Sequence, residues 1–180
     1  MNLGDLPPYS ADDALQVVVE TPRGSTAKFK YDEQHGVVRL SRPLPAGISY
    51  PYDWGFVPGT RAADGDPLDV MVLWESASYP GVVITVRPVG VLRVEQANPK
   101  TRARERNDRL LAIPTTAHTR IPALDDRLRS ELEHFFLAAV AFEGKDVKLL
   151  GWGDAAEAAS LANEAVASAG AGAEHQESGG

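Results

Sequence analysis

The sequence contains no cysteine, which excludes a disulfide framework, a thiolate zinc site and a thiol nucleophile. No apolar run approaches the roughly 18 residues that a membrane-spanning helix needs. The first residues lack the charged and apolar blocks of a secretory signal peptide. These absences favour a cytoplasmic protein with no membrane partner. With 180 residues, 43% of them hydrophobic, the chain has the length and composition of one globular domain.

Positive charge is missing from the end of the chain. Residues 151–180 contain no Lys or Arg but five acidic side chains, whereas residues 1–150 hold 18 basic and 20 acidic ones. The main part is therefore close to neutral, so overall charge predicts no nucleic-acid binding. The Gly-, Ala- and Glu-rich composition from Gly170 onward predicts a disordered acidic tail at 170–180, after a single domain at 1–169.

Short apolar or β-branched runs separated by Pro and Gly predict most of the secondary structure as strands. These runs cover residues 15–20, 26–31, 37–40, 68–74, 82–86, 89–94 and 110–113, with 146–150 as a further candidate. Such punctuation favours a small barrel or sandwich over an alternating β/α sheet. Apolar spacings of three and four predict a helix from Leu124 to Val140, and the Ala-rich residues 155–167 predict a second helix that frays near Ser168.

The densest chemical signal is Asp64-Gly65-Asp66-Pro67-Leu68-Asp69-Val70, which places three carboxylates within six residues. We call it the acidic motif. Strand alternation puts Asp69 on the face opposite Leu68 and Val70. Carboxylates about 5 Å apart repel by roughly 3 kcal/mol at an effective dielectric constant of ~20, and a hard cation such as Mg²⁺ relieves that repulsion. The alternative is a turn whose Asp side chains are solvated or bond to the local backbone.

The wider sequence resembles the soluble (family I) inorganic pyrophosphatases. The resemblance rests on Tyr50-Pro51-Tyr52-Asp53-Trp54-Gly55-Phe56-Val57-Pro58-Gly59-Thr60 followed by the acidic motif, then on Arg87–Leu92, Glu133–Phe136 and Gly151–Asp154, in one register over roughly residues 15–160. It implies a mainly β fold with flanking helices (α+β), built on a five-stranded OB-like barrel. It also implies Mg²⁺-dependent hydrolysis of pyrophosphate, with Mn²⁺ as the alternative ion, by a homo-oligomer.

The resemblance also implies roles for individual residues. Asp64, Asp66 and Asp69 match metal ligands, and Asp66 also matches the acid that orients or deprotonates the attacking water. The matching substrate-binding positions are Lys28, Arg42, Tyr50 and Trp54, and the supporting positions are Glu20, Lys30 and Arg109. Metal-activated water, with Lys and Arg holding phosphate oxygens, is a coherent chemistry for this residue set.

Several positions depart from the family pattern. Lys30 stands for a Glu, Trp54 for a Tyr, Arg109 for a Lys, Gln96 and Asn107 for two Asp ligands, and Ala139–Val140 for a Tyr–Lys pair. Glu95 or Asp108 could replace the missing acids if that loop shifts by one residue. We expect one firmly bound Mg²⁺, with further ions only beside a phosphate-bearing substrate. We also expect Lys30 to border the cavity and to supply positive charge in place of a metal.

Residues 100–109 carry five positive charges, which form either a solvated loop or an arginine-rich lid over phosphate. Three functions remain open: a weakened inorganic diphosphatase, a hydrolase of another phosphate ester or anhydride, and a catalytically degenerate phosphate- or nucleotide-binding barrel. The retained Asp64, Asp66 and Asp69 favour an enzyme acting on pyrophosphate or another small phosphate compound. We expect these three carboxylates to face one cavity together with Lys28 and Arg42.

Overall fold

The computed structural model describes residues 2–98, 100–116 and 124–177. Its elements are η1 (Leu3–Asp5), β1 (Leu15–Thr21), β2 (Ala27–Asp32), β3 (Val37–Pro43), β4 (Asp53–Val57), β5 (Leu68–Val72), β6 (Val83–Ala97), β7 (Arg104–Arg106), β8 (Arg109–Pro114), α1 (Asp126–Ala139), β9 (Lys148–Gly153) and α2 (Ala155–Glu177). No helix among them is long and apolar enough to cross a membrane.

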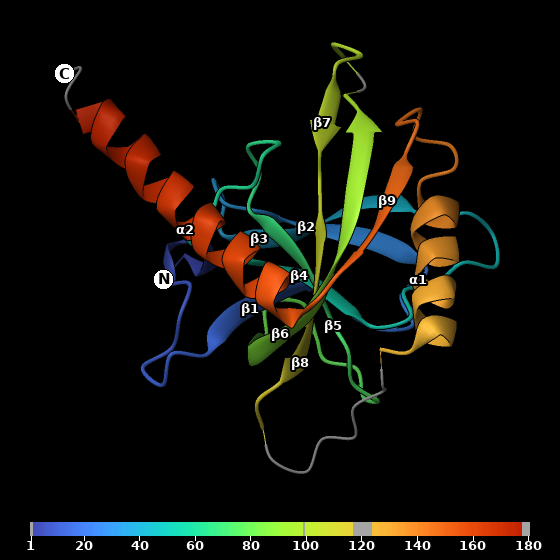
Figure 1. Cartoon of the computed structure of the whole chain (residues 1–180), viewed down its shortest axis with the longest axis horizontal. Coiled ribbons are helices and arrows are strands. Elements are labelled where there is room, and N and C mark those ends of the chain that lie inside the picture. Colours follow the sequence, from blue (N-terminus) through green and yellow to red (C-terminus); the bar gives the residue numbers. More distant parts are fainter. Residues whose placement is uncertain (1, 99, 117–123, 178–180) are drawn as a thin grey trace.

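Five strands close into a ring (Figure 1). The order is β1–β4–β5–β8–β6, and β6 pairs back onto β1. The β5–β8 pair is parallel, whereas the other pairs of the ring are antiparallel. β2 and β3 form a separate hairpin, and β7 and β9 pair with the long β6. The predicted mainly β fold with a five-stranded barrel and flanking helices is therefore confirmed.

β6 differs from its prediction because one long strand replaces the two expected at residues 82–86 and 89–94. Pro88 interrupts the run, but the pairing with β8 shifts between Pro88 and Gly90. A bulge is where a strand tolerates proline, so β6 continues through it. β4 was not predicted from the sequence. The strand contains Gly55, and this position must be glycine because a Cβ there would collide with the carbonyl oxygen of Val18 in β1.

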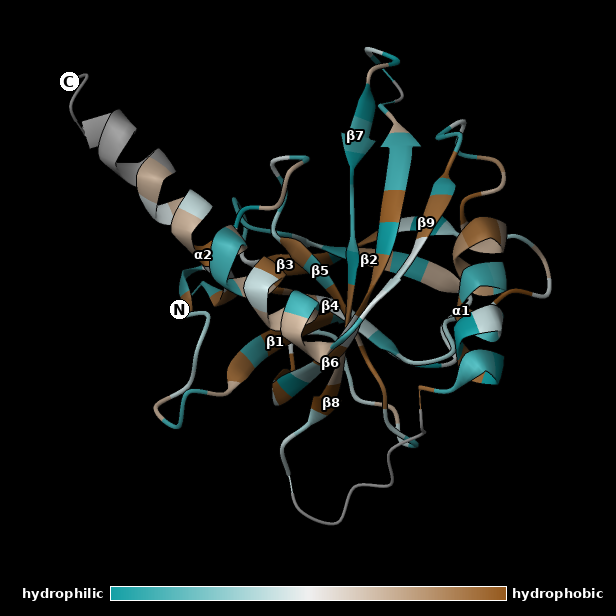
Figure 2. Ribbon diagram, viewed as in Figure 1, coloured by the Kyte–Doolittle hydropathy of each residue, from teal (hydrophilic) through white to brown (hydrophobic). Residues whose placement is uncertain are grey.

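Two apolar clusters form the main core, one on each face of the barrel strands. Leu68, Val70 and Val72 of β5 belong to the first, which also contains the Ala-rich face of α2. Met71 belongs to the second, together with the apolar face of α1. Figure 2 shows hydrophobic residues along the barrel strands and a hydrophilic β7. The predicted alternation is therefore confirmed, and it places Asp69 on the same face as Met71.

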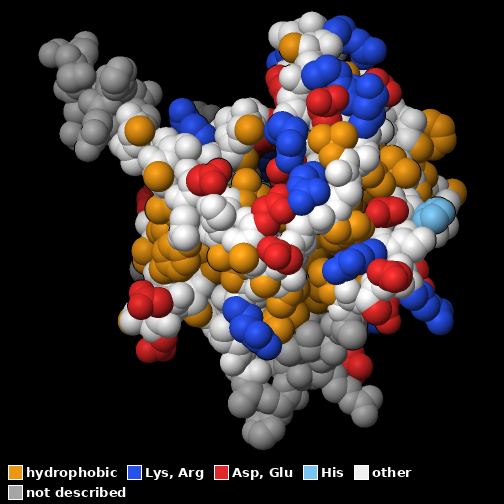
Figure 3. Space-filling view, viewed as in Figure 1, with side chains coloured by type: hydrophobic (Ala, Val, Ile, Leu, Met, Phe, Trp, Pro, Cys, Tyr) orange, Lys and Arg blue, Asp and Glu red, His pale blue; other side chains and the backbone are white. Residues whose placement is uncertain are grey.

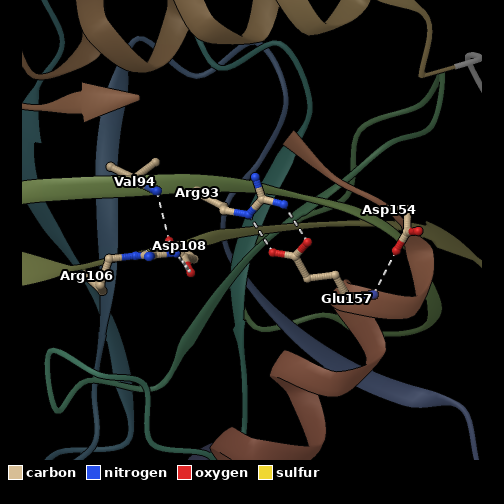
Figure 4. A network of polar contacts seen from close by, with 6 residues as sticks. All are labelled: Arg93, Val94, Arg106, Asp108, Asp154 and Glu157. Carbon is tan, nitrogen blue, oxygen red and sulfur yellow. Dashed lines mark hydrogen bonds and ion pairs between the residues drawn. The ribbon is translucent and has the colours of Figure 1, made fainter. Parts of the chain in front are cut away.

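The two helices begin near their predicted positions. The Asp125 carboxylate caps α1 by accepting a hydrogen bond from the Leu128 amide at 2.9 Å. The start of α2 is attached to β6 by Arg93, which donates to both carboxylate oxygens of Glu157 at 2.6 Å (Figure 4). α2 continues to Glu177, beyond the fraying point predicted near Ser168. The division into a domain at 1–169 and a disordered tail at 170–180 stays a prediction.

Candidate active site

The acidic motif forms a tight turn that leads into β5. The Ala62 amide donates to the Asp66 carbonyl at 2.8 Å, and Gly65 supplies a positive φ of 88°. The Asp64 carboxylate accepts a hydrogen bond from the Asp66 amide at 3.2 Å. This is the local side-chain-to-backbone bond that the alternative interpretation of the motif expected. Asp64 therefore shapes the turn, while Asp66 and Asp69 face a cleft.

That cleft, which we call the acidic cleft, has a volume of about 300 Å³. Its charged side chains come from β1 (Glu20), β2 (Lys30), the loop after β2 (Glu33), the turn (Asp66) and β5 (Asp69). Glu20 is 5% exposed and lies where the β1–β4 pairing shifts between Val19 and Thr21. Lys30 lies at the cleft as expected, and its Nζ donates to Asp66 Oδ2 at 2.9 Å.

Arg109 joins this cleft to the rest of the site. β5 and β8 run parallel with Val70 beside Leu110, so the preceding residues, Asp69 and Arg109, are neighbours on one face. The Arg109 guanidinium donates to the Asp69 carboxylate and to the Asn107 side-chain oxygen. It also stacks on the Trp54 ring, with its central carbon 5.3 Å from the ring centroid. These three contacts fix the position of its positive charge.

A second cavity, of about 40 Å³, lies on the other side of Arg109, and we call it the cationic cavity. Its polar lining consists of Lys28, Arg42, Tyr50, Trp54, Gln96 and Arg109, and α1 and its end contribute apolar side chains. The expectation of a single cavity was wrong. Lys28 and Arg42 line the cationic cavity, whereas Asp66 and Asp69 line the acidic cleft. The Asp69–Arg109 ion pair connects the two.

Among the described residues, two hydrogen-bond donors of the cationic cavity have no protein acceptor. The indole Nε1–H of Trp54 is buried without a hydrogen-bond partner within the described residues. The Lys28 ammonium lies over the Trp54 ring, 6.0 Å from its centroid, and makes no ion pair in the described part of the chain. A buried N–H without an acceptor costs free energy, which an oxygen-rich ligand would recover.

Sequence reasoning missed Lys145, which follows α1 and precedes β9. Its carbonyl accepts a hydrogen bond from the Ala97 amide at 2.5 Å. Desolvation by burial lowers the pKa of Lys145, and the charge of Arg109 lowers it further. The charge of Lys145 in turn lowers the pKa of Lys28. Val140 stands where the family pattern has a lysine, and Lys145 follows shortly after it. This nearby lysine was the signal in the sequence.

Burial is the largest single contribution to the other pKa shifts of the site. It raises the pKa of Glu20 to about 7, although the Tyr31 amide donates to this carboxylate at 2.6 Å and opposes the shift. Burial also raises the pKa of Asp64 and lowers that of Lys28. For Lys30, burial acts to lower the pKa, but the hydrogen bond and charge of Asp66 outweigh it, so the pKa is raised.

The candidate replacement acids have other partners. Asp108 accepts hydrogen bonds from the Val94 amide at 2.9 Å and from Arg106 (Figure 4). Glu95 pairs with Arg104 at 2.7 Å. Neither lines the acidic cleft or the cationic cavity. The loop shift that would bring them to the site is therefore absent from the described structure.

Within the described residues, Arg104 and Arg106 of the basic stretch at 100–109 are not free cations. Arg104 pairs with Glu95 and Asp146, and Arg106 pairs with Asp108. Figure 3 shows basic and acidic side chains interspersed at the top of the molecule, where Figure 1 places β7. Arg109 is the member of this stretch that lines the site. The interpretation as an ordinary charged surface therefore holds for Arg104 and Arg106.

The carboxylates do not form a ready-made metal site. Within the described ranges, no group of three or more His, Cys, Asp or Glu side chains is arranged to hold a metal ion. Carboxylate oxygens suit a hard cation, but Asp66 and Asp69 already have Lys30 and Arg109 as partners. The site as arranged does not fit a resident divalent ion.

Comparison with known proteins decides the family. The family model described as inorganic pyrophosphatase matches residues 17–169. The chain belongs to the inorganic pyrophosphatase family. A pyrophosphatase relative from Sulfolobus acidocaldarius is 37% identical over 160 residues, which cover 84% of this chain and 89% of the relative. Another from Leifsonia xyli is 42% identical over 153 residues, with 82% and 91% covered.

Solved structures agree with this assignment. The crystal structure of the inorganic pyrophosphatase from Thermus thermophilus matches with a TM-score of 0.82 at 34% identity, covering 94% of this chain and 99% of that one. The inorganic pyrophosphatase family implies a hydrolase with a divalent metal requirement. The acidic cleft and the cationic cavity therefore lie in a pyrophosphatase fold in which Asp66 and Asp69 are held by the basic side chains of Lys30 and Arg109.

Proposed function

We propose that this chain is an inorganic diphosphatase: water attacks one phosphorus of pyrophosphate, the bridging P–O bond breaks, and two phosphate ions leave. The observation that carries the proposal is the adjacency of two carboxylates in the acidic cleft to a cavity lined by cations, joined through Asp69 and Arg109. A tetraanionic substrate needs cationic ligands on its oxygens and a base near the attacked phosphorus.

The cationic cavity is the proposed binding site for the substrate. Lys28 and Arg109 are cations whose positions are fixed beside the Trp54 ring, and Arg42 reaches the cavity from β3. The Trp54 indole N–H would donate to a phosphate oxygen, which satisfies a donor that lacks a protein acceptor. Burial raises the pKa of Tyr50, so its hydroxyl stays protonated and can donate as well. Lys145, whose charge acts on Lys28 and Arg109, is the proposed source of a further positive charge.

The acidic cleft is the proposed location of proton transfer. Asp66 is exposed enough to contact water, with a side chain 64% exposed, and it is the proposed acceptor of the proton of the attacking water. A divalent ion, Mg²⁺ first and Mn²⁺ as the alternative, would contact Asp64, Asp66 and Asp69 only once Lys30 and Arg109 have released Asp66 and Asp69. Glu20 and Lys30 are supporting groups that set the charge around these carboxylates.

The other two functions are not favoured, because the relatives and solved structures described above are inorganic pyrophosphatases at high coverage. The test is phosphate release from pyrophosphate and from a panel of phosphate esters and nucleoside triphosphates, with Mg²⁺ or Mn²⁺ present. We expect pyrophosphate to be the best substrate and chelation to abolish release. A higher kcat/KM for any ester would contradict the proposal.

We also propose a cytoplasmic location and a homo-oligomer. Support for self-association comes from apolar side chains on the surface near the end of α1, where Phe142 is 85% exposed and Leu137 is 43% exposed. Light scattering after size-exclusion chromatography would measure a mass above 19.3 kDa if this is right.

A further inference from the structure

Both carboxylates that the acidic motif presents to the acidic cleft are already neutralised by side chains of this chain. Asp66 Oδ2 accepts a hydrogen bond from Lys30 Nζ at 2.9 Å, and Asp69 Oδ2 accepts one from the Arg109 guanidinium. Lys30 comes from the β2–β3 hairpin and Arg109 from the barrel strand β8. The two ion pairs therefore depend on different parts of the fold.

The two cations differ in how firmly they are held. The Arg109 side chain is 12% exposed and has Asp69, Asn107 and the Trp54 ring as partners. The Lys30 side chain is 56% exposed and has Asp66 as its hydrogen-bond partner. Lys30 can therefore leave its carboxylate at low cost, whereas Arg109 can leave only when another anion takes the place of Asp69.

A divalent ion and these cations compete for the same oxygens. Magnesium binds carboxylate oxygens at about 2.1 Å, so an ion on Asp66 would lie close to an ammonium group that now donates to the same carboxylate. The mutual repulsion of the two cations weakens metal binding to the free chain. Pyrophosphate changes this balance, because its oxygens can accept hydrogen bonds from Lys30 and Arg109 and release the carboxylates.

We propose that Lys30 and Arg109 are internal counter-ions of the acidic motif, so that the free chain binds divalent metal weakly and takes it up together with its polyanionic substrate. The inference rests on pyrophosphate being the substrate. It replaces the sequence-based expectation of one firmly bound Mg²⁺. Because binding free energies are reciprocal, metal and pyrophosphate must raise each other's affinity by the same factor.

Calorimetric titration tests this without catalysis. Mn²⁺ and Mg²⁺ are titrated into the free chain and into the chain saturated with imidodiphosphate, a pyrophosphate analogue with a P–N–P bridge, after subtraction of the analogue's own metal binding. We expect the analogue to raise metal affinity by more than about tenfold. Lys30→Gln should raise the analogue-free affinity by about tenfold and reduce the gain that the analogue brings.

Arg127→Gln is the matched control, because Arg127 pairs with Glu131 on the exposed face of α1, away from the site. It should titrate like the unchanged chain. Arg109→Gln, compared after its melting temperature is measured, should act in the same direction as Lys30→Gln. Tight metal binding to the free chain that neither variant alters, or no gain from the analogue, would overturn the inference. Hydrolysis of pyrophosphate, measured in the same preparation, tests the proposed function separately. The metal titration can fail while hydrolysis is observed, and hydrolysis can be absent while the titration behaves as expected.

Discussion

At the residue scale, the site contains an ionisable side chain, Glu20, that is buried away from water. Glu20 is buried beneath the acidic cleft, and its raised pKa means that the folded chain favours the protonated, neutral form. The stabilisation of the folded state by protonated Glu20 is therefore fully present below its unfolded-state pKa of about 4.5. It is lost as the pH rises through the folded-state pKa of about 7.

Glu20→Gln keeps the shape and the acceptor for the Tyr31 amide but removes the titration. Relative to the unchanged chain, its unfolding free energy should rise between pH 4 and pH 8 by about 3 kcal/mol. Urea unfolding at a series of pH values measures this difference. Glu33→Gln removes an exposed carboxylate from the rim of the same cleft and serves as the control. Parallel stability curves for Glu20→Gln and the unchanged chain would contradict the burial argument.

The sequence analysis did not single out Lys145, which we propose adds positive charge to substrate binding. Lys145→Gln should raise KM for pyrophosphate by about tenfold with a smaller change in kcat, because it removes one attractive charge from substrate binding. Lys148→Gln removes a lysine from the exposed start of β9 and should leave both constants unchanged. Steady-state phosphate release measures both variants. If Lys145→Gln and the unchanged chain have equal KM and kcat, Lys145 has no part in substrate binding.

At the element scale, the attachment of α2 depends on three alanines. Ala158, Ala162 and Ala165 are buried against the barrel, and all three precede residue 170. Removal of residues 170–180 should therefore change the unfolding free energy by less than about 0.5 kcal/mol.

Ala162→Asp places a charge in that contact and should destabilise the fold by about 3 kcal/mol or more. Ala167→Asp, at an exposed position of the same helix, is the matched control and should be nearly neutral. Chemical denaturation compares the three variants. A large loss on removal of 170–180 would show that the domain extends beyond residue 169.

The sequence predicts elements better than it predicts their contacts. Alternation in residues 68–74 was enough to predict β5 and the face on which Asp69 lies. β4 was missed because Gly55 breaks the β-forming pattern. Glycine is needed there because β4 approaches β1 closely, which the local sequence does not encode. The Asp69–Arg109 pair arises from parallel pairing of strands about forty residues apart, which only the closed barrel brings together.

At the scale of the whole molecule, the site has two compartments. The acidic motif predicted two residues of the acidic cleft, Asp66 and Asp69, because three carboxylates within six residues form a dense local signal. The division of the expected single cavity into two could not be predicted, since it depends on Arg109 crossing between them. Under the proposed function, the cations of one compartment would bind the substrate, and the carboxylates of the other would contact the attacking water and a divalent ion.

Phosphate release by Asp66→Asn tests this account most directly, since the substitution keeps the shape of the side chain and removes the proposed base. It should be measured at saturating pyrophosphate with Mg²⁺ and compared with the unchanged chain, and imidodiphosphate affinity should be measured in parallel. The account predicts turnover by the unchanged chain, and a kcat at least about a hundredfold lower in the variant with analogue affinity retained. Full turnover by Asp66→Asn, or no hydrolysis by an unchanged chain that binds the analogue, would contradict it.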